Sequence, residues 1–255
     1  MRNLKFLCYA FILSAFNAQA VDSYAPSFED TEEFLVPQTE PTIVPLETWA
    51  YQFELIGANG VTTILALQNE KSLLKPASTM KLFTGWWAFQ NKTRTDAFLS
   101  QMLRDSVNSM AESTVQNMGG VSAMEDYYFA QGLKINDSNF IAADGSGLSY
   151  DNKATCEIEI ELLKMIKADK NYNRFKKLLA QPNKSGTLQT RLTALAGKLF
   201  AKTGTLNRTA SLSGFLETKR GTVVFCVLSD YLNTSVVAAR KKIDNIVKKN
   251  YALVK

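Results

Sequence analysis

The chain has 255 residues, 46% of them hydrophobic, and is therefore long enough to bury one sizeable core. Its 29 lysine and arginine residues outnumber its 24 acidic residues, which gives a formal net charge of +5, and it contains no histidine. The absence of histidine excludes a Ser-His-Asp triad, a Cys-His pair and the usual imidazole metal sites.

Residues 1–20 have the pattern of a secretory signal peptide. Arg2 and Lys5 supply its positive start, and residues 6–16 supply its apolar centre. The small-residue cleavage site Ala18-Gln19-Ala20 follows. Because the apolar run is too short to cross a bilayer, we expect a periplasmic or secreted protein without a stable membrane span.

Residues 21–47 differ in composition from the rest of the chain. They hold seven of the acidic residues and four of the six prolines, with no lysine or arginine, which predicts an extended acidic leader. Residues 48–255, which we expect to form a single domain, carry 27 basic and 17 acidic residues. This charge suits an anionic wall polymer or a membrane surface, and general solubility explains it equally well. No basic-aromatic motif is visible, so nucleic acid is not an expected partner.

The elements of this domain follow from hydrophobic periodicity. Residues 51–58 and 61–68 are β-rich runs around Asn59-Gly60, a dipeptide typical of a hairpin turn. Helical patterns cover residues 79–90, 96–103, a stretch from 108, 123–131, 157–167 and 172–180, and strands resume at 199–205, 210–217 and 222–229, before a closing helix at 234–250. This order predicts an α+β fold, with one antiparallel sheet built from both chain ends, flanking helices and a helical lobe.

Two groups of charged residues on predicted helices could bind a metal ion or a membrane surface. Glu157, Glu159 and Glu161 could suggest a metal site, but a solvated helix face explains them better, and we expect neither metal nor cofactor. Arg240-Lys241-Lys242 and Lys248-Lys249 could contact a membrane surface. A solvated face on a core-packed helix is the interpretation that we favour.

Two cysteines remain after the predicted cleavage. Cys226 lies in the apolar strand candidate, and Cys156 begins a helical pattern. An exported protein can oxidise such a pair, but two cysteines do not form a disulfide framework. We therefore expect free buried thiols.

The most informative motif is Ser78-Thr79-Met80-Lys81. On a helix, residues i and i+3 share a face, so the Lys81 amine can reach the Ser78 hydroxyl. A serine nucleophile needs an adjacent base, and without histidine lysine is the natural one. Ser72-Leu-Leu-Lys75 has the same spacing, but Pro76 disfavours helix at Lys75.

Two further signals follow in chain order, Ser106-Val107-Asn108 and Lys202-Thr203-Gly204. Alone, the first would be a solvated polar stretch and the second an exposed strand end with a turn glycine. The ordered triple is far more specific, since it is the signature of penicillin-binding proteins and related β-lactamases.

With these motifs, the chain resembles class C low-molecular-mass penicillin-binding proteins, the D-alanyl-D-alanine carboxypeptidase/endopeptidase family of the DacB type. The matching segments are 76–81, 105–108 with Ala111-Glu112, 144–149, 185–188 with Arg191, and 201–206. The resemblance spans roughly residues 50–250 and implies the serine β-lactamase/D,D-peptidase (transpeptidase-like) fold. Only twenty-four residues separate Lys81 from Ser106, where family members carry a long insertion, so we expect the accessory domains to be missing.

The resemblance implies catalytic roles for five residues. Ser78 would attack a peptide or β-lactam carbonyl, with Lys81 as its general base. This role requires a neutral amine, hence a pKa lowered by burial or by another cation, for which Lys202 is the candidate. Ser106 would relay protons between the leaving nitrogen and the lysines, and Asn108 would orient Lys81 and hold the substrate backbone.

The third motif would bind substrate along a sheet edge. Gly204 would let a ligand approach the backbone closely. Thr203, Thr205 and Lys202 would donate to a C-terminal carboxylate, which a D-Ala-D-Ala peptide has. The backbone N–H groups of Ser78 and Thr205 would form the oxyanion hole.

These residues predict a penicillin-sensitive serine D,D-peptidase that cleaves D-Ala-D-Ala or D-Ala-linked cross-links of peptidoglycan through a Ser78 acyl-enzyme. Its expected partners are peptidoglycan stem peptides and β-lactam antibiotics. One alternative is a β-lactamase, although no Glu-x-x-Leu-Asn segment lies between Asn108 and Lys202 to activate a deacylating water. The other is a non-catalytic peptidoglycan-binding protein. Because the missing insertion would leave the cleft open, we expect endopeptidase as well as carboxypeptidase activity.

Overall fold

The computed structural model describes residues 46–255, which belong to one compact unit. The predicted signal peptide and almost all of the acidic leader lie outside the described residues, and both stay predictions. Within residues 46–255, no helix is both long and apolar enough to cross a membrane.

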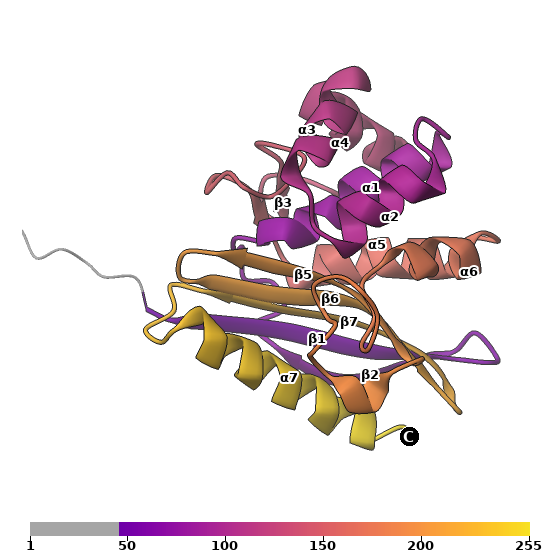
Figure 1. The fold of residues 1–255 in the computed structure, drawn as a ribbon, viewed down its shortest axis with the longest axis vertical. Helices are drawn as coiled ribbons and strands as arrows, with labels where there is room; N and C mark the ends of the chain where they lie inside the picture. Colours follow the sequence, from indigo (N-terminus) through magenta and orange to yellow (C-terminus); the bar gives the residue numbers. More distant parts are fainter. Residues whose placement is uncertain (1–45) are drawn as a thin grey trace, which may run out of the picture. The chain divides into compact units, whose positions relative to one another are not determined.

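A five-stranded antiparallel sheet forms the centre of the fold, with strand order β2-β1-β7-β6-β5 (Figure 1). The strands are β1 (Thr48–Gly57), β2 (Thr62–Gln68), β5 (Leu199–Leu206), β6 (Thr209–Thr218) and β7 (Gly221–Asp230). Strand β1 pairs with β7 along its whole length, so the two ends of the domain meet in one sheet, as predicted. Two short strands, β3 (Phe140–Ile141) and β4 (Lys153–Ala154), form a separate pair.

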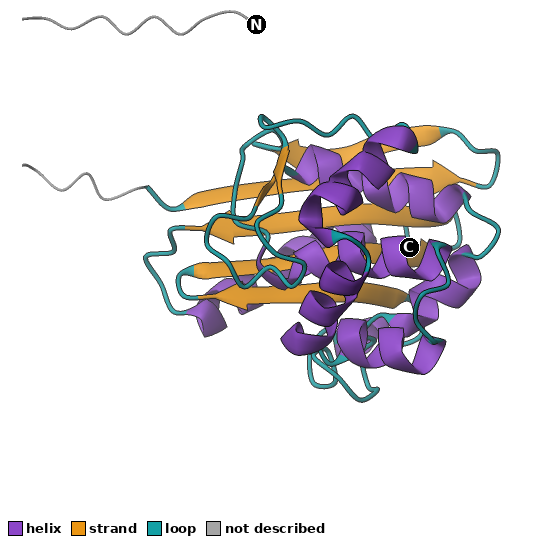
Figure 2. Ribbon diagram, turned by 90° about the horizontal axis from the view of Figure 1, so that it is seen from above, coloured by secondary structure: helices purple, strands orange, loops and turns teal. Residues whose placement is uncertain are grey.

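Helices cover both faces of the sheet and form a lobe beside it (Figures 1 and 2). The lobe contains α1 (Lys81–Gln90), α2 (Asp96–Arg104), α3 (Asn108–Asn117) and α4 (Gly120–Ala130). Helix α5 (Cys156–Ala168) packs on β1 and β7, and α7 (Val236–Ala252) packs on β6 from the opposite face. The predicted α+β architecture with a helical lobe is confirmed.

One predicted helix is shorter than expected. In place of a helix over 172–180, the structure has α6 (Tyr172–Phe175) and a 3₁₀ turn, η2 (Lys176–Leu178). The chain is then extended, and Ala180 exchanges backbone hydrogen bonds with Ala201 of β5. The apolar run therefore ends as an addition to the sheet edge, where its backbone groups find partners that a helix end would lack.

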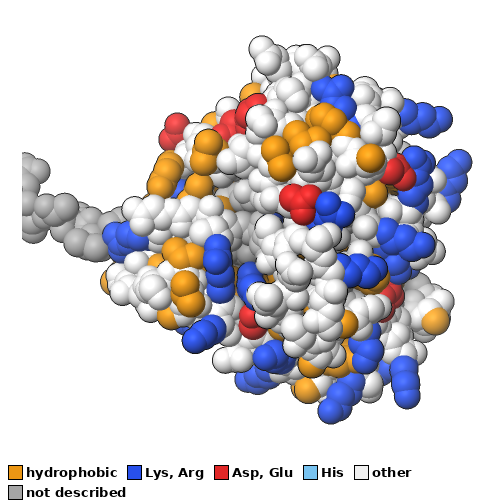
Figure 3. Space-filling model, viewed as in Figure 1, with side chains coloured by type: hydrophobic (Ala, Val, Ile, Leu, Met, Phe, Trp, Pro, Cys, Tyr) orange, Lys and Arg blue, Asp and Glu red, His pale blue; other side chains and the backbone are white. Residues whose placement is uncertain are grey.

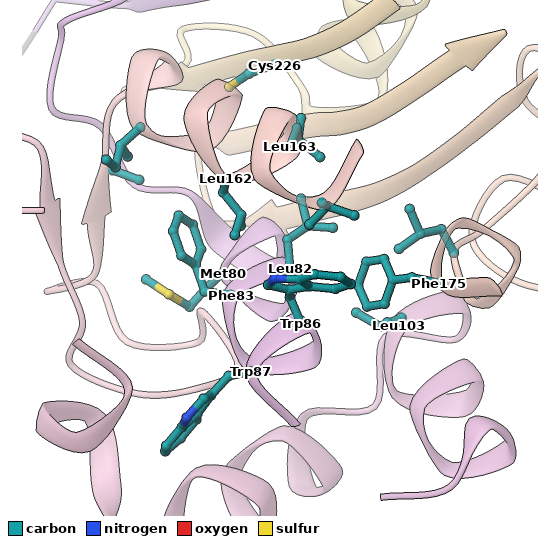
Figure 4. Close-up of a cluster of buried hydrophobic side chains, with 14 of the residues drawn as sticks. Met80, Leu82, Phe83, Trp86, Trp87, Leu103, Leu162, Leu163, Phe175 and Cys226 are labelled. Carbon is teal, nitrogen blue, oxygen red and sulfur yellow. The ribbon is translucent and has the colours of Figure 1, made fainter. Parts of the chain in front are cut away.

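The hydrophobic core has two layers. The larger layer fills the space between the sheet and the lobe, and it includes Trp86, Phe83 and Phe175 (Figure 4). The smaller layer lies between the sheet and α7. Helix α1 is buried from Lys81 to Phe89, so it is a core helix that is apolar on every side. Its position is fixed by packing, and Lys81 at its first residue is fixed with it.

Cys156 and Cys226 form a disulfide, so the expectation of free thiols is wrong. The first turn of α5 lies against β7 in the larger core layer, which brings the two Cα atoms to 5.4 Å (Figure 4 labels Cys226). This distance is typical of disulfides. The two cysteines are 70 residues apart, and nothing in their local sequence shows that their elements pack together.

Candidate active site

The candidate nucleophile lies between the sheet and the lobe. Ser78 belongs to the 3₁₀ turn η1 (Ala77–Met80), which leads directly into α1, so the predicted helix begins with a tighter turn than expected. Lys81 Nζ lies 3.0 Å from Ser78 Oγ, within hydrogen-bond distance. Ala77 has a φ of +50°, a left-handed conformation that costs energy for any residue with a side chain.

Lys81 is held by three polar neighbours. Besides Ser78, its Nζ donates to Asn108 Oδ1 at 2.7 Å and to the backbone carbonyl of Ser146 at 2.6 Å. Burial lowers the pKa of the Lys81 amine to about 8, while the charges of Asp144 and Glu112 oppose this shift. A measurable fraction of the amine is then neutral near pH 7, which a general base requires.

Hydrogen bonds fix the loop that carries Ser146. Asp144 Oδ1 accepts from the backbone N–H groups of Ser146 (3.0 Å) and Gly147 (2.6 Å), and its Oδ2 accepts from Ser149 N (2.6 Å). Glu112 Oε1 also accepts from Ser146 N, at 2.8 Å. The Gly-rich segment 144–149 is therefore a rigid support that aims one carbonyl at the lysine.

Ser106 and Lys202 form a second serine–lysine pair. Lys202 Nζ donates to Ser106 Oγ and to the Thr203 carbonyl, each at 2.8 Å. Lys202 is fully buried, and burial together with the nearby charge of Lys81 holds its pKa well below the ordinary value. Ser106 has a φ of +64°, so a non-glycine residue again adopts a strained backbone at the site.

Gly204 packs against the nucleophile turn. A Cβ atom there would lie 2.0 Å from Ser211 Oγ, 2.8 Å from the Pro76 carbonyl and 2.9 Å from Ser78 N. The glycine is thus required by the protein's own packing, which is a different reason from the ligand approach that we predicted. The same packing brings the backbone N–H of Ser78 beside β5, where the predicted oxyanion partner Thr205 lies.

The two pairs open into one cleft of about 420 Å³. Its lining consists of Ser78, Ser106, Asn108, Thr187, Arg191, Thr203, Thr205 and Arg240. Five of the eight predicted site residues line the cleft, and the other three, Lys81, Lys202 and Gly204, lie directly behind it. All eight are therefore brought together.

Three of the lining residues were not among the predicted site residues. Thr187 Oγ1 lies 2.8 Å from Thr203 Oγ1, and Arg191 pairs with Asp244 at 2.6 Å. Both come from the segment 185–191, whose resemblance to the family was the available signal. Arg240 comes from α7, and for this residue the predicted solvated face is wrong: its Nη2 donates to Thr205 Oγ1 at 2.8 Å.

Glu159 also departs from its predicted solvated position. It is fully buried in α5. Its carboxyl group accepts hydrogen bonds from Thr79 Oγ1, at 2.7 Å, and from Ser213 Oγ. Thr79 is next to the nucleophile, and Ser213 pairs with Lys202 in the sheet. Glu159 therefore fastens the nucleophile turn to β6 from behind the cleft. Burial raises its pKa to about 7, which the two hydroxyl groups oppose.

An antiparallel sheet between helical layers, with a serine–lysine pair where the lobe meets the edge strand, defines the fold of serine β-lactamases and D,D-peptidases. The TLA-3 extended-spectrum β-lactamase superposes with a TM-score of 0.66 at 17% identity, over 81% of this chain and 93% of the other. Penicillin-binding protein 4 from Haemophilus influenzae, solved with a β-lactam, gives a TM-score of 0.55 at 22% identity. The match spans 61% of this chain and 41% of that protein.

The family model of the D-Ala-D-Ala carboxypeptidase 3 (S13) family matches residues 95–251, more than half of the chain, and the chain belongs to this family. Ser78 and Lys81 precede the matched region. A D-alanyl-D-alanine carboxypeptidase from Actinomadura sp. (strain R39) is 28% identical over 156 residues, which are 53% of this chain and 29% of that protein. The predatory endopeptidase Bd3459 of Bdellovibrio bacteriovorus, solved with its immunity protein, is 28% identical, with a TM-score of 0.53 over 60% of this chain and 42% of the other.

Proposed function

We propose that this protein is an exported, penicillin-sensitive serine D,D-peptidase that hydrolyses D-Ala-D-Ala ends and D-Ala-linked cross-links of peptidoglycan. The observation that carries the proposal is the meeting of two serine–lysine pairs, Ser78–Lys81 and Ser106–Lys202, in one cleft. A non-catalytic binding protein would have no need of two buried amines with lowered pKa values, because burying them costs stability.

The proposed acylation begins when neutral Lys81 takes the proton of Ser78 Oγ. The oxygen attacks the carbonyl carbon, and the resulting oxyanion accepts hydrogen bonds from the backbone N–H groups of Ser78 and Thr205. When the C–N bond breaks, Ser106 gives its proton to the leaving nitrogen and is reprotonated from the lysines. Water then attacks the Ser78 ester with Lys81 again as base, which releases the acid product and restores the serine.

The neighbours of Lys81 favour a peptidase over a β-lactamase. The closest one in the loop is the Ser146 carbonyl, which cannot take up a proton from a water molecule. Both oxygens of the Asp144 carboxylate accept from backbone N–H groups of the same loop, and Glu112 Oε1 accepts from one of them. The site therefore lacks the additional glutamate that activates the deacylating water in class A enzymes. We expect a penicilloyl ester on Ser78 to be hydrolysed slowly for this reason.

The short connection between the first two motifs favours broad substrate choice. Helices α1 and α2 are joined by the residues between Gln90 and Asp96, with no inserted domain beside the cleft. A cross-linked muropeptide carries a second stem beyond the scissile bond, and an open cleft removes a steric obstacle to it. The name of Bd3459, a predatory endopeptidase, supports the endopeptidase part of the proposal.

Digestion of purified peptidoglycan, analysed by mass spectrometry, tests the proposal. We expect loss of terminal D-Ala from pentapeptides and conversion of cross-linked dimers to monomers. Ser78→Ala should abolish both reactions, and Ser72→Ala, which alters the other Ser-x-x-Lys motif, should leave both intact. Pentapeptide trimming without dimer cleavage would leave a plain carboxypeptidase, and no cleavage of either would refute the proposal.

A further inference from the structure

Glu159 is a buried carboxyl group that the proposed acylation does not use. On the face of the domain that Figure 3 presents, acidic side chains are interspersed with lysine and arginine at the surface, where water solvates their charge. Glu159, in contrast, is fully buried. Within the part of the chain that the structure describes, it takes part in no ion pair. An apolar side chain could be buried at this position without the desolvation that a carboxyl group requires.

Two hydrogen-bonded links attach the nucleophile turn to strand β6, and Glu159 forms one of them. In the direct link, Ser211 Oγ donates to the Pro76 carbonyl at 2.6 Å. In the other link, Glu159 lies between Thr79 Oγ1, at 2.7 Å, and Ser213 Oγ. The two serines point to the same face of β6 because they are two residues apart. The links reach the turn on both sides of the nucleophile, so together they fix its distance from the sheet.

The Thr79 hydroxyl keeps this link intact whether or not Glu159 carries a proton. It lies 2.7 Å from Glu159 Oε1 and 2.9 Å from the Pro76 carbonyl oxygen, but it has one hydrogen to donate. When Glu159 is ionised, its carboxylate accepts from both Thr79 and Ser213. When it is protonated, its O–H donates to Thr79 Oγ1, and the Thr79 hydroxyl donates to Pro76. The donor changes with pH, and the attachment remains.

The disulfide fixes the position of Glu159. Cys156 and Glu159 share a face of α5 because they are three residues apart. Cys226 lies directly opposite Ser213 where β7 pairs with β6, so the bond from Cys156 to Cys226 holds the first turn of α5 beside Ser213. Ser213 is also the register partner of Lys202 in β5. Glu159 therefore joins the nucleophile turn to the sheet at the level of the third motif.

We propose that Glu159 is a positioning residue, which holds Ser78 at the distance from β5 that the transition state of acylation requires. The inference rests on the proposed D,D-peptidase function. In that reaction the backbone N–H groups of Ser78 and Thr205 bind one oxyanion, so the spacing of turn and strand determines whether both can reach it. The noncovalent complex has no oxyanion. Loss of Glu159 should therefore slow acylation and leave the initial binding almost unchanged.

The test measures acylation by a fluorescent penicillin over a range of concentrations. This separates the limiting acylation rate from the dissociation constant of the noncovalent complex. Glu159→Met removes both hydrogen bonds, and its limiting rate should fall about 10- to 100-fold, since small displacements of reacting groups have effects of this size. Glu159→Gln keeps one donor and one acceptor and should restore a rate close to that of the wild-type protein. Glu161→Met, at an exposed glutamate of the same helix, is the matched control and should acylate normally.

Ser213→Ala keeps the inference testable if Glu159→Met does not fold. It removes the end of the link that lies on β6 and leaves Glu159 in place. Its limiting acylation rate should also fall by more than about threefold, with little change in the dissociation constant. Because Ser213 lies behind the cleft and contacts Ser78 only through Glu159 and Thr79, such a fall would show that the link itself matters.

The outcomes separate this inference from the proposed function. A fall of less than about threefold in Glu159→Met, or in Ser213→Ala if the first variant does not fold, would overturn the inference while the protein remains a peptidase. A weaker noncovalent complex with an unchanged limiting rate would overturn it as well, as would equal losses in Glu159→Gln and Glu159→Met. A wild-type protein that is neither acylated nor able to cleave peptidoglycan would instead refute the proposed function.

Discussion

Lys81 Nζ lies 2.6 Å from the backbone carbonyl oxygen of Ser146, in a loop 65 residues further along the chain. This contact and the one to Asn108 hold the amine beside the Ser78 hydroxyl. The carbonyl accepts a hydrogen bond from either the charged or the neutral amine, so it orients the lysine without preventing proton uptake.

The first prediction concerns the pH dependence of acylation. Only neutral Lys81 can accept the proton of Ser78, and burial lowers its pKa to about 8. The rate of acylation by benzylpenicillin should therefore rise with pH, fall about tenfold per pH unit well below the midpoint, and level off above it. Stopped-flow measurement between pH 5 and pH 10 checks this, and Lys81→Ala should be almost inactive throughout. A rate that rises toward acidic pH would contradict the role of Lys81.

The second prediction concerns Glu112. Its charge raises the pKa of Lys81, while its Oε1 accepts from the Ser146 N–H. Glu112→Gln keeps an oxygen acceptor and removes the charge, so the midpoint of the acylation profile should move to lower pH. Glu157→Gln, at a partly exposed carboxylate that pairs with Lys71, is the matched control and should leave the midpoint unchanged. A shift to higher pH in Glu112→Gln would show that its charge does not act on Lys81.

The third prediction concerns stability. Burial raises the pKa of Glu159 from 4.5 to about 7, so between these values the folded protein keeps a proton that the unfolded chain has lost. Unfolding free energy should therefore fall as pH rises from about 4.5 to 7, by on the order of 3 kcal/mol from this group, and then level off. Glu159→Gln should remove this slope, and the exposed Glu161→Gln should retain it. Urea titrations at several pH values measure the unfolding free energy. Equal pH slopes in the wild-type protein and both variants would contradict the role of Glu159.

The fourth prediction concerns the Cys156–Cys226 disulfide. Protein that lacks residues 1–20, and with them Cys8, should show no free thiol with a thiol reagent when it is purified without reductant and then denatured. The double variant Cys156→Ser, Cys226→Ser should be less stable by about 2–4 kcal/mol, since the bond restrains a long loop of the unfolded chain. Two reactive thiols in the oxidatively prepared, denatured protein would show that the bond does not form.

The secondary structure was largely predictable because its signals are local. The Asn59-Gly60 turn and the apolar periodicity place β1, β2 and the helices within a few residues of their observed ends. The predicted site residues also meet in one cleft, because the three motifs lie on elements whose packing the resemblance to the family supplies. The run at 172–180 was mistaken for one helix because its partner, Ala201, is distant in sequence.

The residues that were missed depend on packing between segments far apart in the chain. Ser146 is 65 residues from Lys81, Glu159 is 80 from Thr79, and Arg240 is 35 from Thr205. Ser146 acts through its backbone, which no residue type reveals. A glutamate or arginine on an amphipathic helix is normally solvated, so only the position of α5 and α7 on the sheet shows that these two point inward.

Intact-protein mass spectrometry after incubation with benzylpenicillin tests the central claim most directly. We expect one covalent adduct that persists for hours and maps to the peptide containing Ser78. It should be absent in Ser78→Ala and present in Ser72→Ala. An adduct that remains in Ser78→Ala, or an unmodified wild-type protein with its penicillin intact, would contradict the assignment of Ser78 as the nucleophile. Rapid hydrolysis of the penicillin by wild-type protein would identify a β-lactamase instead.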